Sequence, residues 1–247
     1  MRHFFKANIF ILLLTSVFMA SCTKEDTNPC IQGEGAIVTR TLSVTNFSGI
    51  DLAGASNVTI SQGTEQQVIA TGHSNIIDLV STSVSGDVWS IRLVDGCYDN
   101  YELSFQITVP NIEDIVLSGS GNIVVNDFTD QGDLAVVVSG SGNIDFDSFD
   151  GCENASFSIS GSGQIRGLED FADLKNLNIV ISGSGNFNGF PIETENCMIT
   201  ISGSGNCEVS VRDELIITIS GSGNVFYKGM PIISSTITGS GEVIDAN

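Results

Sequence analysis

The sequence predicts an all-β protein, a right-handed parallel β-helix (solenoid) with about 18–22 residues in each coil. The segment Ser-Gly-Ser-Gly-Asn-Ile at residues 118–123 recurs with the same six letters at 139–144, and variants continue to the C-terminus. Apolar residues alternate with polar ones before each copy, which is the period of a β-strand. Together the repeat and the alternation predict strands that stack coil upon coil.

The copies of the motif keep a nearly constant spacing. Their first glycines lie 18 to 22 residues apart, at Gly119, Gly140, Gly161, Gly183, Gly203, Gly221 and Gly239. We interpret the motif as a corner between strands, where glycine would reach positive φ and Ser and Asn would tolerate a tight bend. An antiparallel barrel or sandwich is the competing fold, but it has no need for similar corners at every second turn.

Stacked corners predict a ladder of polar side chains. Neighbouring strands lie about 4.8 Å apart, so the polar residue that ends each corner should stand beside its counterpart in the next coil. The corner ladder would consist of Asn122, Asn143, Gln164, Asn186, Asn206 and Asn224, and would end at Glu242. Val, Ile, Leu and Phe from the alternating positions would fill the interior.

The N-terminus is typical of an exported lipoprotein. Residues 1–21 carry Arg2 and Lys6, then an apolar run from Ile9 to Ala20, and they end in small residues, as a signal peptide does. Cys22 follows directly and resembles the lipobox cysteine of bacterial lipoproteins, so we expect it to be lipidated. This predicts a lipid anchor at the outer membrane or cell surface, on either face of that membrane.

The rest of the chain divides into segments that differ in how regularly the corner motif repeats. Residues 22–36 are expected to form a tether and residues 37–247 a single domain. Within that domain, residues 37–117 alternate but repeat only faintly, as in Leu52–Val58, and are interpreted as irregular N-terminal coils. Residues 118–247 hold the regular repeats.

The repeated corners, together with the phrases Phe47-Ser48-Gly49-Ile50-Asp51 and Asn57-Val58-Thr59-Ile60-Ser61-Gln62-Gly63, carry a family resemblance. They resemble the auto-transporter adhesin, head GIN domain family, over roughly residues 38–247. Lys24, Glu25 and Asp26 after Cys22 also resemble the surface-export signal of Bacteroidetes lipoproteins. The family resemblance implies adhesion, but the chain lacks the segment expected for an autotransporter's membrane barrel, so a lipid anchor is expected in its place.

The net charge limits the possible partners, and the number of cysteines limits the possible disulfides. The sequence has 9 Lys and Arg against 29 Asp and Glu, and removal of residues 1–21 leaves 7 − 29 = −22, which excludes nucleic acid as a partner. If Cys22 is lipidated, five cysteines remain, so at least one should stay unpaired. Cys30 with Cys97 is the expected disulfide, although spacing alone does not fix the connectivity.

Acidic residues are the main candidates for chemistry. They cluster after the first three corners, within residues 127–173, so a glycan-active enzyme is one alternative. Asp127, Asp145 and Asp147 are weak candidates for a cation, but no metal, cofactor or catalytic residue is expected. His73 is the only histidine after the signal segment, which excludes sites that need two imidazoles.

The sequence therefore favours a noncatalytic envelope lipoprotein that presents a rigid β-helix face for binding or adhesion. Its partners would be the membrane, through the anchor, and a protein or glycan ligand. The enzyme and a purely structural envelope component remain alternatives.

Overall fold

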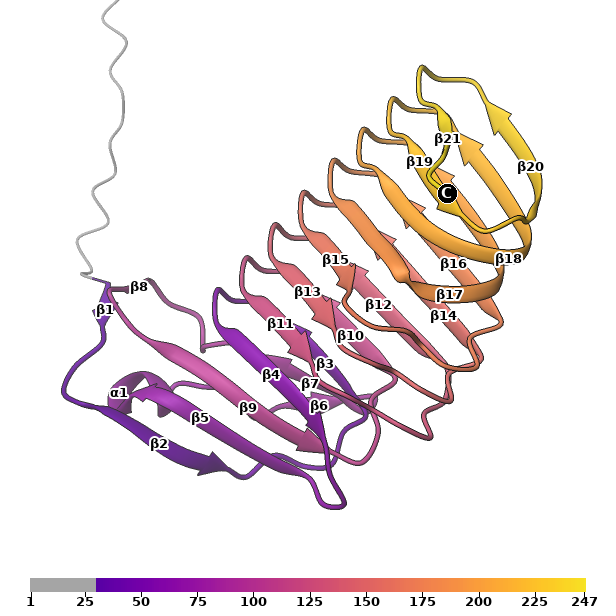
Figure 1. The fold of residues 1–247 in the computed structure, drawn as a ribbon. Helices are drawn as coiled ribbons and strands as arrows, with labels where there is room; N and C mark the ends of the chain where they lie inside the picture. The colour runs from indigo at the N-terminus through magenta and orange to yellow at the C-terminus, as the bar shows by residue number, and fades with distance from the viewer. Residues whose placement is uncertain (1–29) are drawn as a thin grey trace, which may run out of the picture.

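The computed structural model describes residues 30–247 and shows a nearly all-β solenoid of stacked parallel coils (Figure 1). The predicted signal peptide and Cys22 lie outside the described residues. Each regular coil contributes one strand to each of two walls, and the Ser-Gly-Ser-Gly corner joins them. The predicted β-helix is confirmed. In the described residues no helix is long and apolar enough to cross a bilayer.

The first wall carries the strands that precede the corners. Its strands lie side by side in the order β6 (Val84–Ser85), β7 (Val88–Ile91), β3 (Gly49–Leu52), β10 (Asp114–Leu117), β12 (Leu134–Val138), β14 (Asn154–Ile159), β16 (Asn176–Ile181), β17 (Asn186–Ile201), β18 (Cys207–Ile219) and β20 (Ile232–Ile237).

The second wall carries the strands that follow the corners. Its order is β2 (Ile37–Leu42), β5 (Gln67–His73), β9 (Leu103–Val109), β4 (Asn57–Gln62), β11 (Asn122–Val125), β13 (Asn143–Phe146), β15 (Gln164–Gly167), then the first parts of β17 and β18, and finally β19 (Val225–Lys228) and β21 (Val243–Asp245). The long strands β17 and β18 run from one wall into the other.

The N-terminal end stacks in an order that differs from the order of the sequence. The coil of β3 and β4 lies between β10 and β11 on one side and the later strands β7 and β9 on the other. Antiparallel strands then cover this end, because β6 pairs with β7, and β5 pairs with both β9 and β2. The short helix α1 (Ser74–Ile77) follows β5. The chain therefore caps this end of the solenoid with its own strands.

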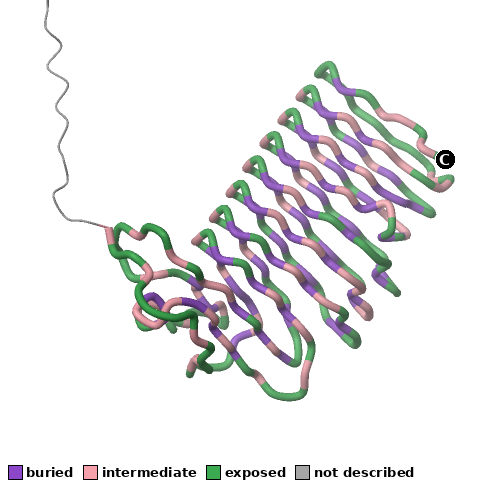
Figure 2. The backbone as a smooth tube through the Cα atoms, turned by 60° about the vertical axis from the view of Figure 1, so that its left-hand side comes forward, coloured by how far each residue is buried: buried purple, intermediate pink, exposed green. Residues whose placement is uncertain are grey.

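The interior is filled by the alternating apolar residues, and buried and exposed positions alternate along the strands (Figure 2). Trp89 is completely buried near the capped end, and its indole Nε1 donates to the Ser81 carbonyl at 3.0 Å. Six phenylalanines from successive coils and loops pack with ring centroids 5.1–6.5 Å apart: Phe128, Phe146, Phe149, Phe157, Phe171 and Phe187. Their burial supplies much of the stability.

The described cysteines form one disulfide and leave three thiols free. Cys30 and Cys97 form a disulfide, which confirms that pairing and fastens β1 (Ile31–Gln32) beside β8 (Tyr98–Asp99). Cys152, Cys197 and Cys207 are free and buried. Burial raises the pKa of Cys152 to about 11, so this thiol stays protonated and unreactive at neutral pH.

The corners need glycine for a reason that differs from the sequence-based one. None of the repeated corner glycines has a positive φ; the glycines that do are Gly35, Gly86, Gly151 and Gly229. Instead, the backbone of each corner lies against that of the preceding coil. A Cβ added to a corner glycine from Gly119 to Gly241 would stand only 1.7–2.1 Å from a carbonyl oxygen of that coil. The expectation of positive φ was therefore wrong, and close backbone approach excludes a side chain.

Replacing a corner glycine should destabilise the fold strongly. In Gly142→Ala the new Cβ would meet the Gly121 oxygen at 1.8 Å, so the free energy of unfolding should fall by about 2 kcal/mol or more. Gly132→Ala is the matched control, because nothing lies within 4 Å of its Cβ position, and it should change stability by less than about 0.5 kcal/mol. Urea unfolding of both variants measures the difference, and equal losses would contradict the close-approach explanation.

Candidate functional site

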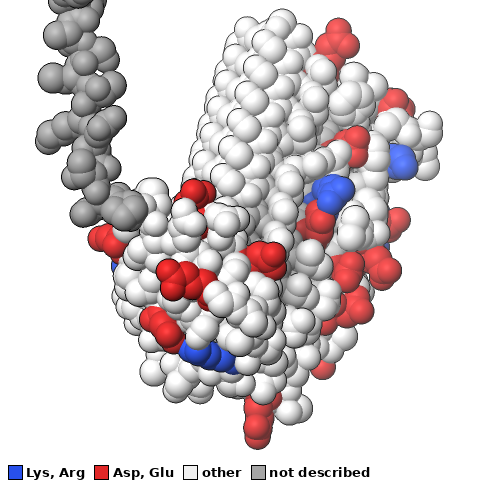
Figure 3. All heavy atoms as spheres, turned by 90° about the vertical axis from the view of Figure 1, so that its left-hand side faces the viewer, with Lys and Arg blue, Asp and Glu red and all other residues white. Residues whose placement is uncertain are grey.

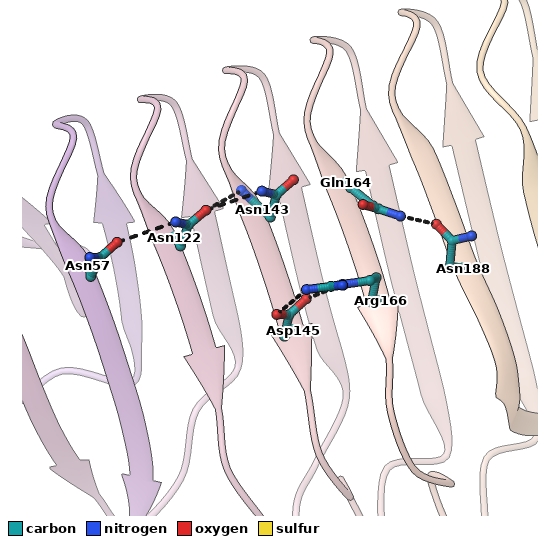
Figure 4. A network of polar contacts seen from close by, with 7 residues as sticks. All are labelled: Asn57, Asn122, Asn143, Asp145, Gln164, Arg166 and Asn188. Carbon is teal, nitrogen blue, oxygen red and sulfur yellow. Dashed lines mark hydrogen bonds and ion pairs between the residues drawn. The ribbon is translucent and has the colours of Figure 1, made fainter.

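The corner ladder begins where each strand of the second wall leaves its corner. Strand register aligns Asn57, Asn122, Asn143, Gln164 and Asn186. Asn122 Nδ2 donates to Asn57 Oδ1 at 3.4 Å, and Asn143 Nδ2 donates to Asn122 Oδ1 at 3.2 Å (Figure 4). These amides link adjacent coils directly.

Nearer the C-terminus, side chains of the corner ladder accept hydrogen bonds from backbone N–H groups. Asn186 Oδ1 accepts from the Asn206 N–H at 2.8 Å, and Asn206 Oδ1 accepts from the Asn224 N–H at 2.9 Å. Asn224 Oδ1 accepts in turn from the Glu242 N–H at 2.9 Å. Each amide therefore satisfies a backbone donor of the next coil, and the contacts are internal to the protein.

Gln164 departs from the ladder. Its side chain is one methylene longer than asparagine, and its Nε2 donates to Oδ1 of Asn188, two residues beyond the aligned Asn186 (Figure 4). The structure thus places the predicted residues in one line, while the amide contacts run along the line only on either side of Gln164. This arrangement serves the stacking of coils.

A second ladder lies at the start of the first-wall strands and was not predicted. Asn154 Nδ2 donates to Asp133 Oδ1 at 2.9 Å, Asn176 Nδ2 donates to Asn154 Oδ1 at 2.9 Å, and Asn196 Nδ2 donates to Asn176 Oδ1 at 3.2 Å. We call these four residues the groove ladder. Their spacing of 21, 22 and 20 residues follows the repeat, so aligning the residues before each apolar alternation would have found them.

Beside the groove ladder lies a groove of about 770 Å³, which we call the side groove. It crosses β10, β12, β14, β16, β17 and β18. Strand register puts one row of its lining residues in line along the stack: Asp114, Ala135, Ser156, Asn178, Met198 and Ile216. The side groove therefore runs along the solenoid and offers a mixed apolar and amide surface, with Met198 half exposed at 51%.

The charge of the side groove is negative. Glu113 and Asp114 line it at the β10 end and Glu214 at the β18 end, and Asp133 stands between them. Its lining contains no Lys or Arg. The face of the molecule drawn in Figure 3 is likewise mostly acidic among its charged side chains. The side groove would therefore repel anions and accept neutral or cationic groups.

The acidic loops of residues 127–173 have a structural use. Asp127 Oδ1 accepts from the Ser148 hydroxyl at 2.8 Å, and Asp150 Oδ1 accepts from the Ala172 N–H at 3.0 Å. Asp170 Oδ1 accepts from the Glu193 N–H at 2.9 Å. Among the acids of these loops, only Asp133 lines the side groove. The loop carboxylates thus hold neighbouring coils together and do not converge on that groove.

The three weak cation candidates lie on neighbouring coils of the second wall. Arg166 holds Asp145 with two bonds, Nε to Oδ1 at 2.7 Å and Nη2 to Oδ2 at 2.6 Å (Figure 4), while Asp127 bonds Ser148. Among residues 30–247 no group of three or more His, Cys, Asp or Glu side chains is placed to hold a metal ion. His73 Nδ1 accepts from the Glu102 N–H at 3.1 Å.

Asp147 should lower stability when it is charged. Burial raises its pKa, and the charges of Asp127 and Asp145 raise it further. When the pKa of an acid is higher in the folded state than in the unfolded state, the acid destabilises the fold as pH rises above its unfolded-state pKa. It has no effect at low pH, where it is protonated in both states. Asp147→Asn should therefore raise Tm modestly at about pH 7 and leave it unchanged at about pH 3.

Asp213→Asn, an exposed acid on another coil, is the control for the loss of one negative charge. Thermal unfolding followed by circular dichroism at both pH values makes the comparison. A gain for Asp147→Asn that persists at low pH would contradict this origin.

Several solved structures share the fold. A structure described as a "putative adhesin" from Bacteroides fragilis is 22% identical, with a TM-score of 0.79, over 87% of this chain and 99% of that one. One described as a "putative lipid binding protein" from Parabacteroides distasonis is 21% identical, with a TM-score of 0.70, over 88% and 99%. At this identity the likeness concerns the fold alone.

No curated protein matches the sequence. The sequence profile of the family described as "Putative auto-transporter adhesin, head GIN domain" matches residues 46–231. That range spans the coil of β3 and β4, the side groove and all but the last copy of the corner motif. The chain belongs to the head GIN domain family.

Proposed function

We propose that this protein is a noncatalytic binding module of the cell envelope that holds its ligand in the side groove. The observation that carries the proposal is the alignment of the groove ladder with a parallel row of small, amide and apolar side chains along one rigid wall. Family membership supports an adhesion-like role, since the family description names an adhesin. The structural use of the loop carboxylates supports the noncatalytic part.

The repetition of the side groove points to a repeating ligand. Asn154, Asn176 and Asn196 offer similar amide groups on successive coils, about 4.8 Å apart. Each Nδ2 carries two hydrogens and gives one to the ladder, which leaves one for a ligand hydroxyl. With acids at both ends and no basic residue, the surface suits a neutral polysaccharide lying along the stack.

Placement on the envelope is the second part of the proposal. The family description as an adhesin suggests a cell-surface or envelope protein. A lipid on Cys22 would hold the module at the outer membrane through a tether shorter than the expected residues 22–36, because the disulfide of Cys30 and the pairing of β1 with β8 fasten the chain from residue 30 onward. The described chain begins at Cys30, at the capped end of the solenoid (Figure 1), so an anchor on Cys22 would attach to that end.

Blocking the side groove should abolish binding. The test uses the soluble chain from residue 23, which keeps every described residue, on an array of neutral polysaccharides followed by titration calorimetry of the best hit. Met198→Arg places a large charged side chain in the groove and should weaken binding by about 10-fold or more. Leu168→Arg is the matched control, because Leu168 is 49% exposed and lies outside the groove, and it should bind normally.

Other results would contradict the proposal. Equal binding by both variants would exclude the side groove, and a hit only with a protein ligand would exclude the polysaccharide. Cleavage of the polysaccharide by the wild-type protein would favour a glycan-active enzyme instead.

Removal of Cys22 should release the protein from membranes. In cells, Cys22→Ser would lose the acceptor thiol for the lipid, so the protein should move from the membrane fraction to the soluble fraction and lose labelling by a fatty-acid probe. Cys152→Ser is the control for loss of a thiol and should remain with the membranes. Membrane association that survives Cys22→Ser would contradict the anchor.

A further inference from the structure

The C-terminal end of the solenoid is an uncovered sheet edge. β20 pairs with β18 on one side, and in the described chain no strand lies on its other side (Figure 1). All six residues of β20 are exposed. The opposite end differs, because β6 covers β7 and β5 covers β9. The fold therefore caps one end and leaves backbone donors and acceptors free at the other.

This edge is also unusually apolar. Met230 is 93% exposed and Ile232 80%, and Ile233 and Ile237 are exposed as well. Ile233 and Ile237 occupy positions whose counterparts in the preceding coil, Leu215 and Ile219, are buried in the core. The uncovered edge thus displays the cross-section of the hydrophobic interior, which is the kind of surface that proteins bury against a partner.

The distribution of charge favours a second copy of this chain as the partner of β20. The chain carries a net charge of −20, so two copies repel each other over most of their surfaces. Residues 230–241, which contain β20, have no charged side chain. The neighbouring edge of β21 has Glu242 and Asp245, and such charges protect an edge from pairing. β20 is thus the segment where a second acidic copy meets no like charge.

We infer that β20 pairs antiparallel with β20 of a second copy and joins two solenoids end to end. A two-fold axis at Ser235 makes this pairing self-complementary. Ser235 then lies opposite itself, Ile233 lies opposite Ile237 of the other copy on the core side, and Ser234 lies opposite Thr236 on the outer side. Residues directly opposite in an antiparallel pair share a face, so this register keeps core with core.

The size of the edge sets the strength of association. A six-residue strand is ~20 Å long and the two walls lie ~10 Å apart, so the end offers about 200 Å² per copy. Stable interfaces use about 800 Å² per partner, so the pair forms only when the protein is concentrated. We expect monomers at about 1 µM and a growing dimer fraction toward about 500 µM.

Charge exchange at the two outer positions tests the pairing. Ser234→Asp/Thr236→Asp and Ser234→Lys/Thr236→Lys each place like charges opposite each other, so each protein alone should associate about 10-fold less than wild type. An equimolar mixture of the two should form heterodimers more tightly than the wild type, because every opposing pair then has opposite charges. Sedimentation velocity of the chain from residue 23, from about 1 to about 500 µM, measures all three samples.

The controls separate misfolding from loss of pairing. Asp or Lys at Ser202 and Ser220, exposed corner residues away from the edge, adds the same charge and should leave wild-type association unchanged. Recovery in the mixture shows that both double variants are folded. A wild-type protein that stays monomeric at about 500 µM, or a mixture that does not associate, would overturn the inference. Polysaccharide binding by these variants should be normal, since β20 does not line the side groove.

Discussion

At every Ser-Gly-Ser-Gly corner the backbone of one coil lies against the carbonyl oxygens of the coil before it. This contact fixes the distance between coils where one wall turns into the other, and it leaves no room for a β-carbon. The hydrogen bonds of both walls, the amide ladders and the column of apolar side chains all require the same spacing. A side chain at a corner would force coils apart and disturb each of these contacts together.

The order of strands near the N-terminus illustrates what local pattern conveys. Alternation indicated strands within residues 37–117, where β5, β7 and β9 lie, and the faint copy at Leu52–Val58 does form the corner between β3 and β4. Yet alternation describes only which face a residue takes, so it could not reveal that β7 and β9 stack outside β3 and β4. That arrangement depends on contacts between residues 39 and 47 positions apart, which do not match the spacing of the repeat.

Some features of the candidate site could likewise be predicted from the sequence, and others could not. The corner ladder could be predicted, because identical letters at a fixed period stack whenever parallel strands do. The departure of Gln164 toward Asn188 depends on the length of one side chain and the position of another. The side groove could not be predicted at all, since it is lined by side chains from six neighbouring strands whose identities vary from coil to coil. The reason for the corner glycines was likewise visible only once neighbouring coils were in place.

Acidic residues illustrate how one property serves two purposes. In the loops, carboxylates accept backbone hydrogen bonds from the next coil, while their charge keeps the long surface soluble. Where acids are absent, as on β20, the surface is uncharged and the edge is free. Distribution of charge along the chain, more than its total, therefore decides which surfaces can meet another molecule.

The regular coils touch only their immediate neighbours, so the molecule behaves mechanically as a stack of interchangeable units. Inserting or deleting one unit of about twenty residues would change the reach of the rod by one strand spacing, about 4.8 Å, and leave both ends intact. Such a chain can vary in length during evolution by duplication within its gene, without reinventing a core. The length of the solenoid therefore changes only in whole coils. The surfaces at its two ends can evolve independently of the distance between them.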